Sequence, residues 1–237
     1  MNTITAGRGQ IPLALGTRER PGFDLFVTDR NGEALLAIKS AAGLSSRDSI
    51  YLWGVEGSGK SHLLQAACIH AGECGHSVAY IPLGGAEELQ PAVLEDLDEM
   101  DLVCVDDIDT VAGDLQWEQP LLYLYNRLRD RSAVMIIAGR SSPKSLALEL
   151  PDLKSRMAWG LVYHLQPLDD DQKISVLQQR AHARAFDLPD DVAGYLVRRV
   201  RRDLPGLISL LDQFEEATLV EKRKLTIPFV KSLLSSQ

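Results

Sequence analysis

The apolar residues of the chain fall into two kinds of pattern. Short unbroken apolar runs, such as Leu102-Val103-Cys104-Val105, are typical of parallel strands that are buried on both faces. Other stretches place apolar residues three and four positions apart, which predicts helices with one buried face. The expected strands lie at 49–53, 77–81, 102–105, 133–138 and 161–165. The expected helices lie at 34–42, 62–68, 86–97, 114–131 and 150–157.

This alternation of strands and helices predicts one α/β domain. Strands that are separated by helices pair in parallel, so we expect a five-stranded parallel sheet with helices on both faces. Phosphate-bearing ligands bind such sheets at the carboxyl ends of the strands. The domain is expected to span residues 23–166.

The pattern changes after Gln166, beyond which we expect no strand. Helical spacing recurs at 170–185, 189–202, 205–221 and 227–234. Pro189 and Pro228 mark two of the boundaries between these stretches. We therefore expect a small helical domain over 167–237. Residues 1–22 show little periodicity and are predicted to form a flexible tail.

Composition narrows the class of protein. The 237 residues are 45% hydrophobic, as in ordinary globular proteins, and no apolar run is long enough to cross a bilayer. The amino terminus has no apolar signal segment. Cys68, Cys74 and Cys104 lack the spacing of a disulfide framework or a zinc site. We therefore expect a cytoplasmic protein that does not contact a membrane.

The charge balance argues against broad affinity for DNA. The formal net charge is -8, whereas binding to DNA needs clustered lysine and arginine. One basic cluster departs from this balance, and it consists of Arg198, Arg199, Arg201 and Arg202. This cluster is either a solvated helix face or a contact for a nucleotide or a partner.

A glycine-rich loop carries the most specific signal. Residues Gly54 to Ser61 match the phosphate-loop pattern in full, between a predicted strand and a predicted helix. The glycines let successive backbone N–H groups point at phosphates, and the following helix adds the positive end of its dipole. Lys60 can reach the terminal phosphates, and the Ser61 hydroxyl can bind Mg²⁺. The residues expected to bind a nucleotide are Gly54, Gly57, Ser58, Gly59, Lys60, Ser61 and His62.

Two carboxylates follow the buried strand at 102–105. A carboxylate at the end of such a strand, in a chain with a phosphate loop, is typical of the Walker B element. Asp106 would hold Mg²⁺ largely through water, and Asp107 would act as a base or position the attacking water. The alternative is that the two aspartates only open a turn.

A short motif in the tail has the form of a docking peptide. In Gln10-Ile11-Pro12-Leu13-Ala14-Leu15 the apolar residues alternate behind a polar one. Ile11, Leu13 and Leu15 can therefore enter a groove in extended form, and Pro12 limits the entropy of the free peptide. The alternative is an apolar segment that tucks against the domain.

Several stretches resemble a known family. A phosphate-loop domain followed by a helical lid resembles the layout of AAA+ proteins, and the stretches at 23–27, 54–64, 105–108 and 153–161 are similar to the bacterial initiator DnaA. No basic helix-turn-helix pattern of the kind with which DnaA reads DNA follows the lid. The short length, the hexapeptide and the segment 225–231 together resemble the Hda family, the regulatory inactivators of DnaA.

The resemblance implies roles for particular residues. The hexapeptide would dock on the sliding clamp (β subunit) of DNA polymerase III, with Gln10 in a polar pocket and Leu13 and Leu15 in an apolar one. Arg156 would enter the site of DnaA and stabilise charge on the γ-phosphoryl group of its ATP. From the sequence alone, Arg156 could instead be a surface arginine paired with Asp152. DNA would be contacted only through the clamp. The resemblance leaves open whether the chain forms a homo-oligomer.

Two departures bear on hydrolysis by the chain itself. Arg140 stands where relatives carry an acidic or polar sensor residue. The position of the lid arginine that senses the γ-phosphate in DnaA falls near Pro205 in this chain, with Arg201 and Arg202 close by. Both favour a protein that holds ADP or ATP as a structural ligand and has weak or no ATPase activity.

The expected function is negative regulation of replication initiation through hydrolysis of DnaA-bound ATP. One rival is a self-contained AAA+ ATPase that loads a helicase or remodels nucleic acid. A further alternative is an adaptor that binds the clamp without a nucleotide.

Overall fold

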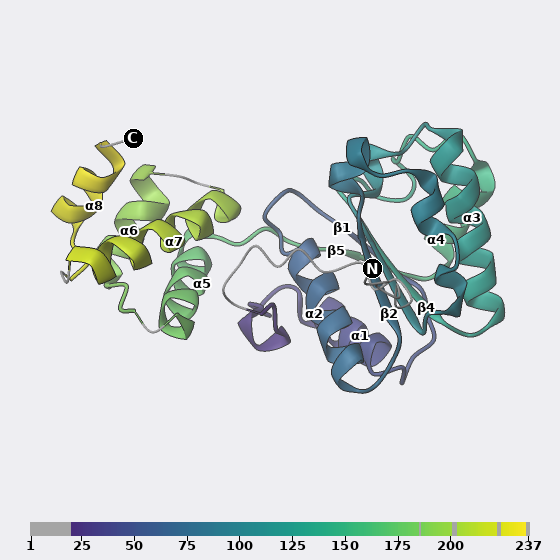
Figure 1. Cartoon of the computed structure of the whole chain (residues 1–237), viewed down its shortest axis with the longest axis horizontal. Coiled ribbons are helices and arrows are strands. Elements are labelled where there is room, and N and C mark those ends of the chain that lie inside the picture. The colour runs from purple at the N-terminus through teal and green to yellow at the C-terminus, as the bar shows by residue number, and fades with distance from the viewer. Residues whose placement is uncertain (1–19, 185, 201–202, 222–223, 236–237) are drawn as a thin grey trace, which may run out of the picture.

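The structure, a computed structural model, describes residues 20–184, 186–200, 203–221 and 224–235. These residues form an α/β domain and a helical domain, which lie side by side along the longest axis of the molecule (Figure 1). The docking hexapeptide predicted at Gln10, Ile11, Leu13 and Leu15 lies outside the described residues. Two members of the basic cluster, Arg201 and Arg202, lie outside them as well.

Five parallel strands form the sheet of the α/β domain. Ile50 lies opposite Ile136 on one side and Leu161 on the other. The strands Leu102–Asp106 and Val134–Gly139 are buried throughout, because helices cover both of their faces. The prediction of a five-stranded parallel sheet is confirmed. In sheet order the strands are β2 (Val78–Pro82), β3 (Leu102–Asp106), β4 (Val134–Gly139), β1 (Ile50–Trp53) and β5 (Leu161–His164).

Helices cover the two faces of this sheet (Figure 1). The first two helices pack on one face, where Ile38 and Leu63 are fully buried. The next two pack on the opposite face, around Leu121 and Leu153. Because the strands are parallel, the loops after β1, β3 and β4 leave the sheet at the same edge. The helices are α1 (Gly32–Ala42), α2 (Lys60–Glu73), α3 (Leu115–Asp130) and α4 (Pro151–Trp159).

The segment between β2 and β3 is not the helix that the sequence predicts over 86–97. It forms three short 3₁₀ turns within 83–99 instead. Pro91 lacks the N–H that a continuous helix needs and keeps Gln90 extended, with φ -113° and ψ 152°. The apolar spacing has another cause, because Leu94 enters the core from one of these turns.

The second domain is helical and has a core of its own, in which Leu177, Leu211 and Phe214 are fully buried. The helix predicted over 189–202 is α-helical to Tyr195 and continues as a π-helical segment to Val200, and its last two predicted residues lie outside the described ones. The other three predicted helices of this domain are present. The elements are α5 (Asp170–Ala183), α6 (Asp190–Tyr195), the π-helical segment η6 (Leu196–Val200), α7 (Leu204–Glu221) and α8 (Ile227–Ser235).

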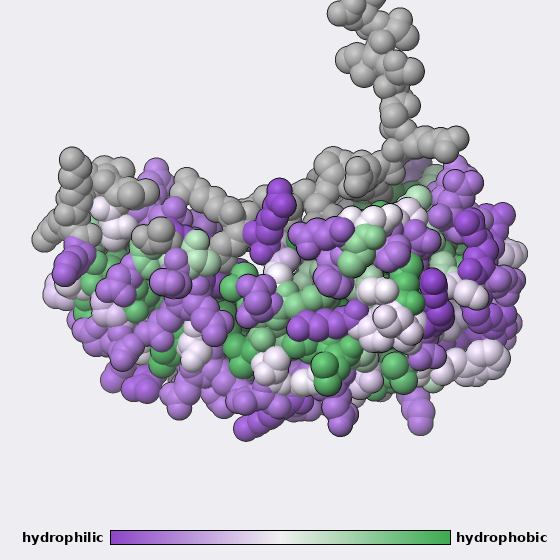
Figure 2. Space-filling model, turned by 90° about the horizontal axis from the view of Figure 1, so that it is seen from below, coloured by the Kyte–Doolittle hydropathy of each residue, from purple (hydrophilic) through white to green (hydrophobic). Residues whose placement is uncertain are grey.

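The described surface is largely polar. Figure 2 shows the molecule from below, where polar side chains cover most of the face and apolar ones gather toward the middle, near the junction of the domains. Apolar surface at a junction between domains is a common setting for a small-molecule site. Of the helices described here, none combines the length and the apolar character needed to cross a membrane.

Candidate functional site

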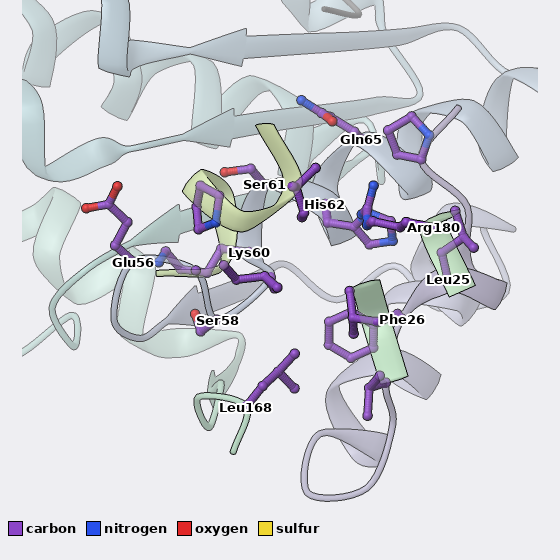
Figure 3. A pocket seen from close by; sticks show the side chains of 18 of the residues that line it. Leu25, Phe26, Glu56, Ser58, Lys60, Ser61, His62, Gln65, Leu168 and Arg180 are labelled. Atoms are coloured by element: carbon purple, nitrogen blue, oxygen red, sulfur yellow. The ribbon is translucent and has the colours of Figure 1, made fainter. Parts of the chain in front are cut away.

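A cavity of about 450 Å³ lies between the phosphate loop and the helical domain (Figure 3). The α/β domain contributes the stretch from Glu56 to His62. The helical domain contributes residues of α5 and the start of α7, and Leu168 lines the cavity from the connecting segment. Because both domains line the cavity, its shape depends on the angle between them.

The phosphate loop has the backbone conformation that the motif requires. Gly57 and Gly59 have φ of 77° and 96°, in the region where residues with a side chain are strained. Gly59 also has no room for a side chain, since a Cβ there would lie 2.7 Å from Cε2 of Phe26. α2 begins at Lys60, so its first N–H groups, which have no partner within the helix, adjoin the loop. The loop can therefore hold phosphates with backbone groups.

Lys60 is buried within this loop. Its Nζ donates to the carbonyl oxygens of Gly54 and Val55, at 2.7 and 3.0 Å. Burial lowers the pKa of the Lys60 amine, and the charge of Asp106 opposes that shift. The buried Ser58 hydroxyl has no hydrogen-bond partner among the residues described. An ammonium group and an unpaired hydroxyl in one loop fit a phosphate, which offers acceptors to both.

The two neighbouring aspartates have different surroundings. Asp106 is buried, and its Oδ2 accepts a hydrogen bond of 2.8 Å from the Tyr80 hydroxyl. Its Oδ1 accepts a bond of 3.0 Å from the N–H of Asp107. Asp107 lines the cavity and adopts a left-handed conformation with φ 55°. Burial, and then the charge of Asp106, raise the pKa of the Asp107 carboxyl.

Oxygen donors suited to Mg²⁺ lie at the loop and behind it. Ser61 and Asp107 line the cavity, and Asp106, the last residue of β3, directly precedes Asp107. In phosphate-loop proteins a hydroxyl, the phosphates and water fill most of the coordination shell, so few protein ligands are needed. Among the described residues, no group of three or more His, Cys, Asp or Glu side chains is arranged so that it could hold a metal ion by itself. These residues fit an Mg²⁺ ion that the nucleotide and water hold for the most part.

The apolar side of the cavity was not predicted from the sequence. Leu25, Phe26 and Val27, which precede α1, line it together with Val176 of α5 and Ile208 of α7. Figure 3 shows Leu25 and Phe26 projecting from a segment that runs beside the phosphate loop. Flat apolar surface of this kind suits a nucleobase. The aromatic and apolar run before the first predicted helix is the signal that could have revealed it.

His62 connects three parts of the site. Its Nε2 lies 2.8 Å from the carbonyl oxygen of Gly22, and its Nδ1 lies 3.3 Å from Nη2 of Arg180 on α5. Its ring also stacks with Phe26. The two hydrogen bonds need the tautomer in which Nε2–H donates and Nδ1 accepts. Burial, assisted by the charge of Arg180, lowers the pKa of His62 to about 4, so the ring is neutral at pH 7.

Both residues that depart from the expected sensors lie at the cavity. Arg140 lines it, and the backbone N–H groups of Arg140 and Ser141 donate to the Asp109 carboxylate. Pro205 also lines it, with its Cδ 3.3 Å from the position that a Cβ on Gly57 would take. The start of α7 therefore lies against the phosphate loop, with the positive end of the helix dipole toward it.

Arg156 lies outside this cavity, on α4. Its guanidinium carbon lies 4.4 Å from the centre of the Trp159 ring. The ion pair with Asp152 that the sequence left open does not form, and no other carboxylate among the described residues takes its place. No described carboxylate therefore neutralises the charge of Arg156.

Both domains of the chain match known protein families. Residues 18–164, more than half of the chain, match the family model of the bacterial DnaA ATPase domain. The chain belongs to the bacterial DnaA ATPase-domain family. Residues 170–234 match the model of the Hda lid domain. The resemblance seen in the sequence is confirmed for both the α/β domain and the lid.

Solved structures show the same AAA+ fold. Domain III of the Thermotoga maritima initiator DnaA aligns with a TM-score of 0.77 and 22% identity, over 91% of this chain and 95% of that one. AMPPCP-bound DnaA from Aquifex aeolicus aligns with a TM-score of 0.67 and 22% identity, over 81% and 65%. The Thermotoga maritima RuvB branch-migration motor aligns with a TM-score of 0.69 and 14% identity, over 92% of this chain and 72% of that one.

For this member of the DnaA family, the structure brings most predicted site residues together. Of the seven nucleotide-binding residues predicted, all but Gly54 line the cavity, and Gly54 accepts from Lys60 at the start of the loop. Asp107 joins them, whereas Asp106 is held behind it by Tyr80. The roles of these residues, and those of Arg156 and the tail, stay predictions.

Proposed function

We propose that this chain is a negative regulator of replication initiation, which holds an adenine nucleotide and stimulates hydrolysis of the ATP bound to DnaA. One observation carries the proposal. A DnaA-type domain with an Hda lid displays an arginine, Arg156, that lies outside its own cavity and has no described carboxylate partner. A charge presented in this way suits action on a second molecule.

The nucleotide is proposed to act mainly as a structural ligand. The loop N–H groups and Lys60 would bind its phosphates, and the side formed by Phe26 and Ile208 would bind its base. The binding of AMPPCP by the related Aquifex aeolicus DnaA supports an adenine nucleotide. Ser61 and Asp106 would hold Mg²⁺, which offsets phosphate charge. A ligand in contact with both domains fixes the angle between them.

Arg156 is proposed to complete the site of DnaA. In hydrolysis, a water oxygen forms a bond to the γ-phosphorus, the bond from that phosphorus to the β,γ-bridging oxygen breaks, and ADP leaves with the electron pair. The attacking water gives up a proton to the solvent, so the second product is inorganic phosphate. Negative charge spreads over the phosphoryl oxygens on the way. A guanidinium group beside those oxygens stabilises this transition state more than the bound ATP, and therefore raises the rate.

Hydrolysis in the chain's own cavity is proposed to be weak. The lid places Pro205 and the start of α7 over the phosphate loop, and α7 contains no arginine. A helix end carries only about half an elementary charge. It therefore supports charge on a γ-phosphoryl group less strongly than an arginine side chain does.

The tail is proposed to bring the chain to its place of action. Gln10, Ile11, Leu13 and Leu15 would bind the sliding clamp, which encircles DNA. Binding to a clamp near DnaA raises the effective concentration of Arg156 beside the DnaA site without a new contact. Contact with DNA is indirect in this scheme.

The decisive experiment follows hydrolysis of ATP on DnaA in the presence of DNA, clamp and this protein. Arg156→Ala should lower the stimulated rate by about a hundredfold or more, because arginine fingers contribute roughly 10³ to 10⁵ to the rate in GTPases. Arg131→Ala, at the exposed end of α3, is the matched control and should stimulate normally. Undiminished stimulation by Arg156→Ala would rule out the finger.

The role of the tail is tested with Gln10→Ala combined with Leu13→Ala. This variant should lose binding to the clamp and should lose stimulation only in reactions that contain clamp-loaded DNA. Thr3→Ala with Thr5→Ala, in the same tail, should behave as the unchanged protein does. Equal binding of both variants to the clamp would exclude the hexapeptide as the docking site.

A self-contained ATPase remains the second candidate, because Asp107 and Ser61 both line the cavity and could support hydrolysis there. ATP turnover by the isolated protein, with and without single-stranded DNA, separates the two candidates. A regulator should turn over slowly in both conditions. Turnover that single-stranded DNA accelerates and Asp107→Asn abolishes would favour the second candidate.

A further inference from the structure

The last residue of α4 is an exposed tryptophan. Trp159 has 67% of its surface exposed, although large aromatic side chains usually bury most of theirs. The other tryptophans differ, since Trp117 is buried in the core and Trp53 stacks on His164. An exposed tryptophan calls for a role outside the core.

The neighbour of this ring is Arg156, one helical turn earlier. The guanidinium group lies over the ring at 4.4 Å, within the range of a cation–π interaction. This interaction limits the rotamers of a side chain that otherwise has large conformational entropy. Unlike a carboxylate, the ring does not neutralise the positive charge. Arg156 is thus restrained in position while its charge stays free to meet an anion.

The helix that carries the pair is anchored at both ends. At its start, the buried Glu118 accepts hydrogen bonds from the N–H groups of Glu149 and Leu150, at 3.1 and 2.7 Å. At its end, Gly160 packs so closely on Ser49 that a Cβ would collide with the Ser49 carbonyl. The backbone that carries Trp159 is therefore held at both ends of α4, and the ring can restrain the Arg156 side chain from a fixed position.

We propose that Trp159 is a positioning residue, which holds the Arg156 guanidinium in the orientation that it needs to reach the γ-phosphoryl group in the partner's site. The proposal rests on the proposed function of Arg156. A charged group that is already ordered before docking loses less entropy on reaching the transition state, so the ring acts on the rate of hydrolysis rather than on affinity.

The test measures hydrolysis of ATP on DnaA over a range of concentrations of this protein, with clamp-loaded DNA. Trp159→Ala should lower the maximal stimulated rate about fivefold, the fold-change that corresponds to about 1 kcal/mol of cation–π interaction. The concentration that gives half of the maximal stimulation should change by less than about twofold. Trp159→Phe, which keeps an aromatic face, should restore most of the rate.

Two controls identify the cause. Tyr123→Ala removes an aromatic side chain of similar exposure from α3 and should leave both parameters unchanged. Trp159→Ala should add no further loss to Arg156→Ala, because the ring acts through the arginine. Thermal unfolding of each variant shows whether the fold is intact.

The outcomes distinguish the positioning role of Trp159 from the finger role of Arg156 on which it rests. If Arg156→Ala stimulates normally, the proposed finger fails and the inference fails with it. If Arg156→Ala is inactive but Trp159→Ala keeps its maximal rate, only the positioning role is overturned. A Trp159→Ala variant that raises the half-maximal concentration alone would make the ring a docking contact and would likewise overturn positioning.

Discussion

At the scale of single residues, the site depends on polar groups that are buried and held by specific partners. Lys60 donates to two loop carbonyls, Asp106 accepts from Tyr80, and His62 lies between Gly22 and Arg180. Burial opposes the charged form of an ionisable side chain, so a change in protonation at such a group is linked to a change in folding stability.

His62 makes stability depend on pH. A histidine in the unfolded chain takes up a proton near pH 6.5, whereas His62 in the folded chain does so only near pH 4. The contribution is therefore complete above pH 6.5 and is lost as the pH falls toward 4. We expect the free energy of unfolding to decrease by up to about 1.4 kcal/mol per pH unit in this window.

Urea unfolding at pH 7.5, 6.5, 5.5 and 4.5 measures this dependence. His62→Gln keeps a polar side chain that cannot titrate, so part of the slope below pH 6.5 should disappear. His182→Gln, on the exposed side of α5, is the matched control and should keep the slope. An unchanged slope in His62→Gln would mean that other groups produce the effect.

At the scale of elements, one buried carboxylate joins α3 to α4. Glu118 has no exposed surface, and its oxygens accept from the N–H groups of Gly113, Glu149 and Leu150. The N–H groups of Glu149 and Leu150 precede α4, whose start has no side-chain cap of its own. A residue on α3 therefore orders the helix that carries Arg156.

Glu118→Ala should be strongly destabilising, because it leaves three backbone donors without their acceptor. Charge-assisted hydrogen bonds contribute about 1.5–3 kcal/mol each, with incomplete additivity, so we expect a loss of about 3 kcal/mol or more in the free energy of unfolding. Glu118→Gln keeps the shape and one acceptor oxygen and should lose less. Gln119→Ala, its exposed neighbour, should stay near the unchanged protein in the same urea titration.

At the scale of the whole molecule, two cores share one cavity. The α/β domain and the lid each bury their own apolar cluster, and the cavity collects residues from both, from Phe26 to Ile208. A ligand in this position stabilises both domains and their mutual arrangement, and the stabilisation grows with its concentration.

We expect ADP to raise the thermal unfolding temperature. At about one hundred times its dissociation constant a ligand adds about 2.7 kcal/mol, which corresponds to a shift of roughly 5–10 °C for a chain of this size. Lys60→Ala should abolish the shift, whereas Lys144→Ala, an exposed lysine outside the cavity, should preserve it. A full shift in Lys60→Ala would place the nucleotide elsewhere.

The features that local physical chemistry controls could be predicted from the sequence. The parallel strands follow from continuous apolar runs, and the phosphate loop follows from glycines at positions such as Gly57 and Gly59, where φ is positive. Asp107 could be placed near the loop because parallel strands bring their carboxyl ends to one edge. Where a single local feature decided otherwise, as Pro91 did, apolar spacing was an insufficient guide.

Contacts between residues that are distant in the chain became visible only in the folded structure. Phe26 against Gly59, Pro205 over Gly57 and Arg180 beside His62 each join segments that are far apart in the chain. No periodicity encodes such contacts, and the second and third also depend on how two separately packed domains lie against each other. The same holds for Arg156, whose motif was visible in the sequence. That it forms no ion pair with a described carboxylate became apparent only when α4 was in place.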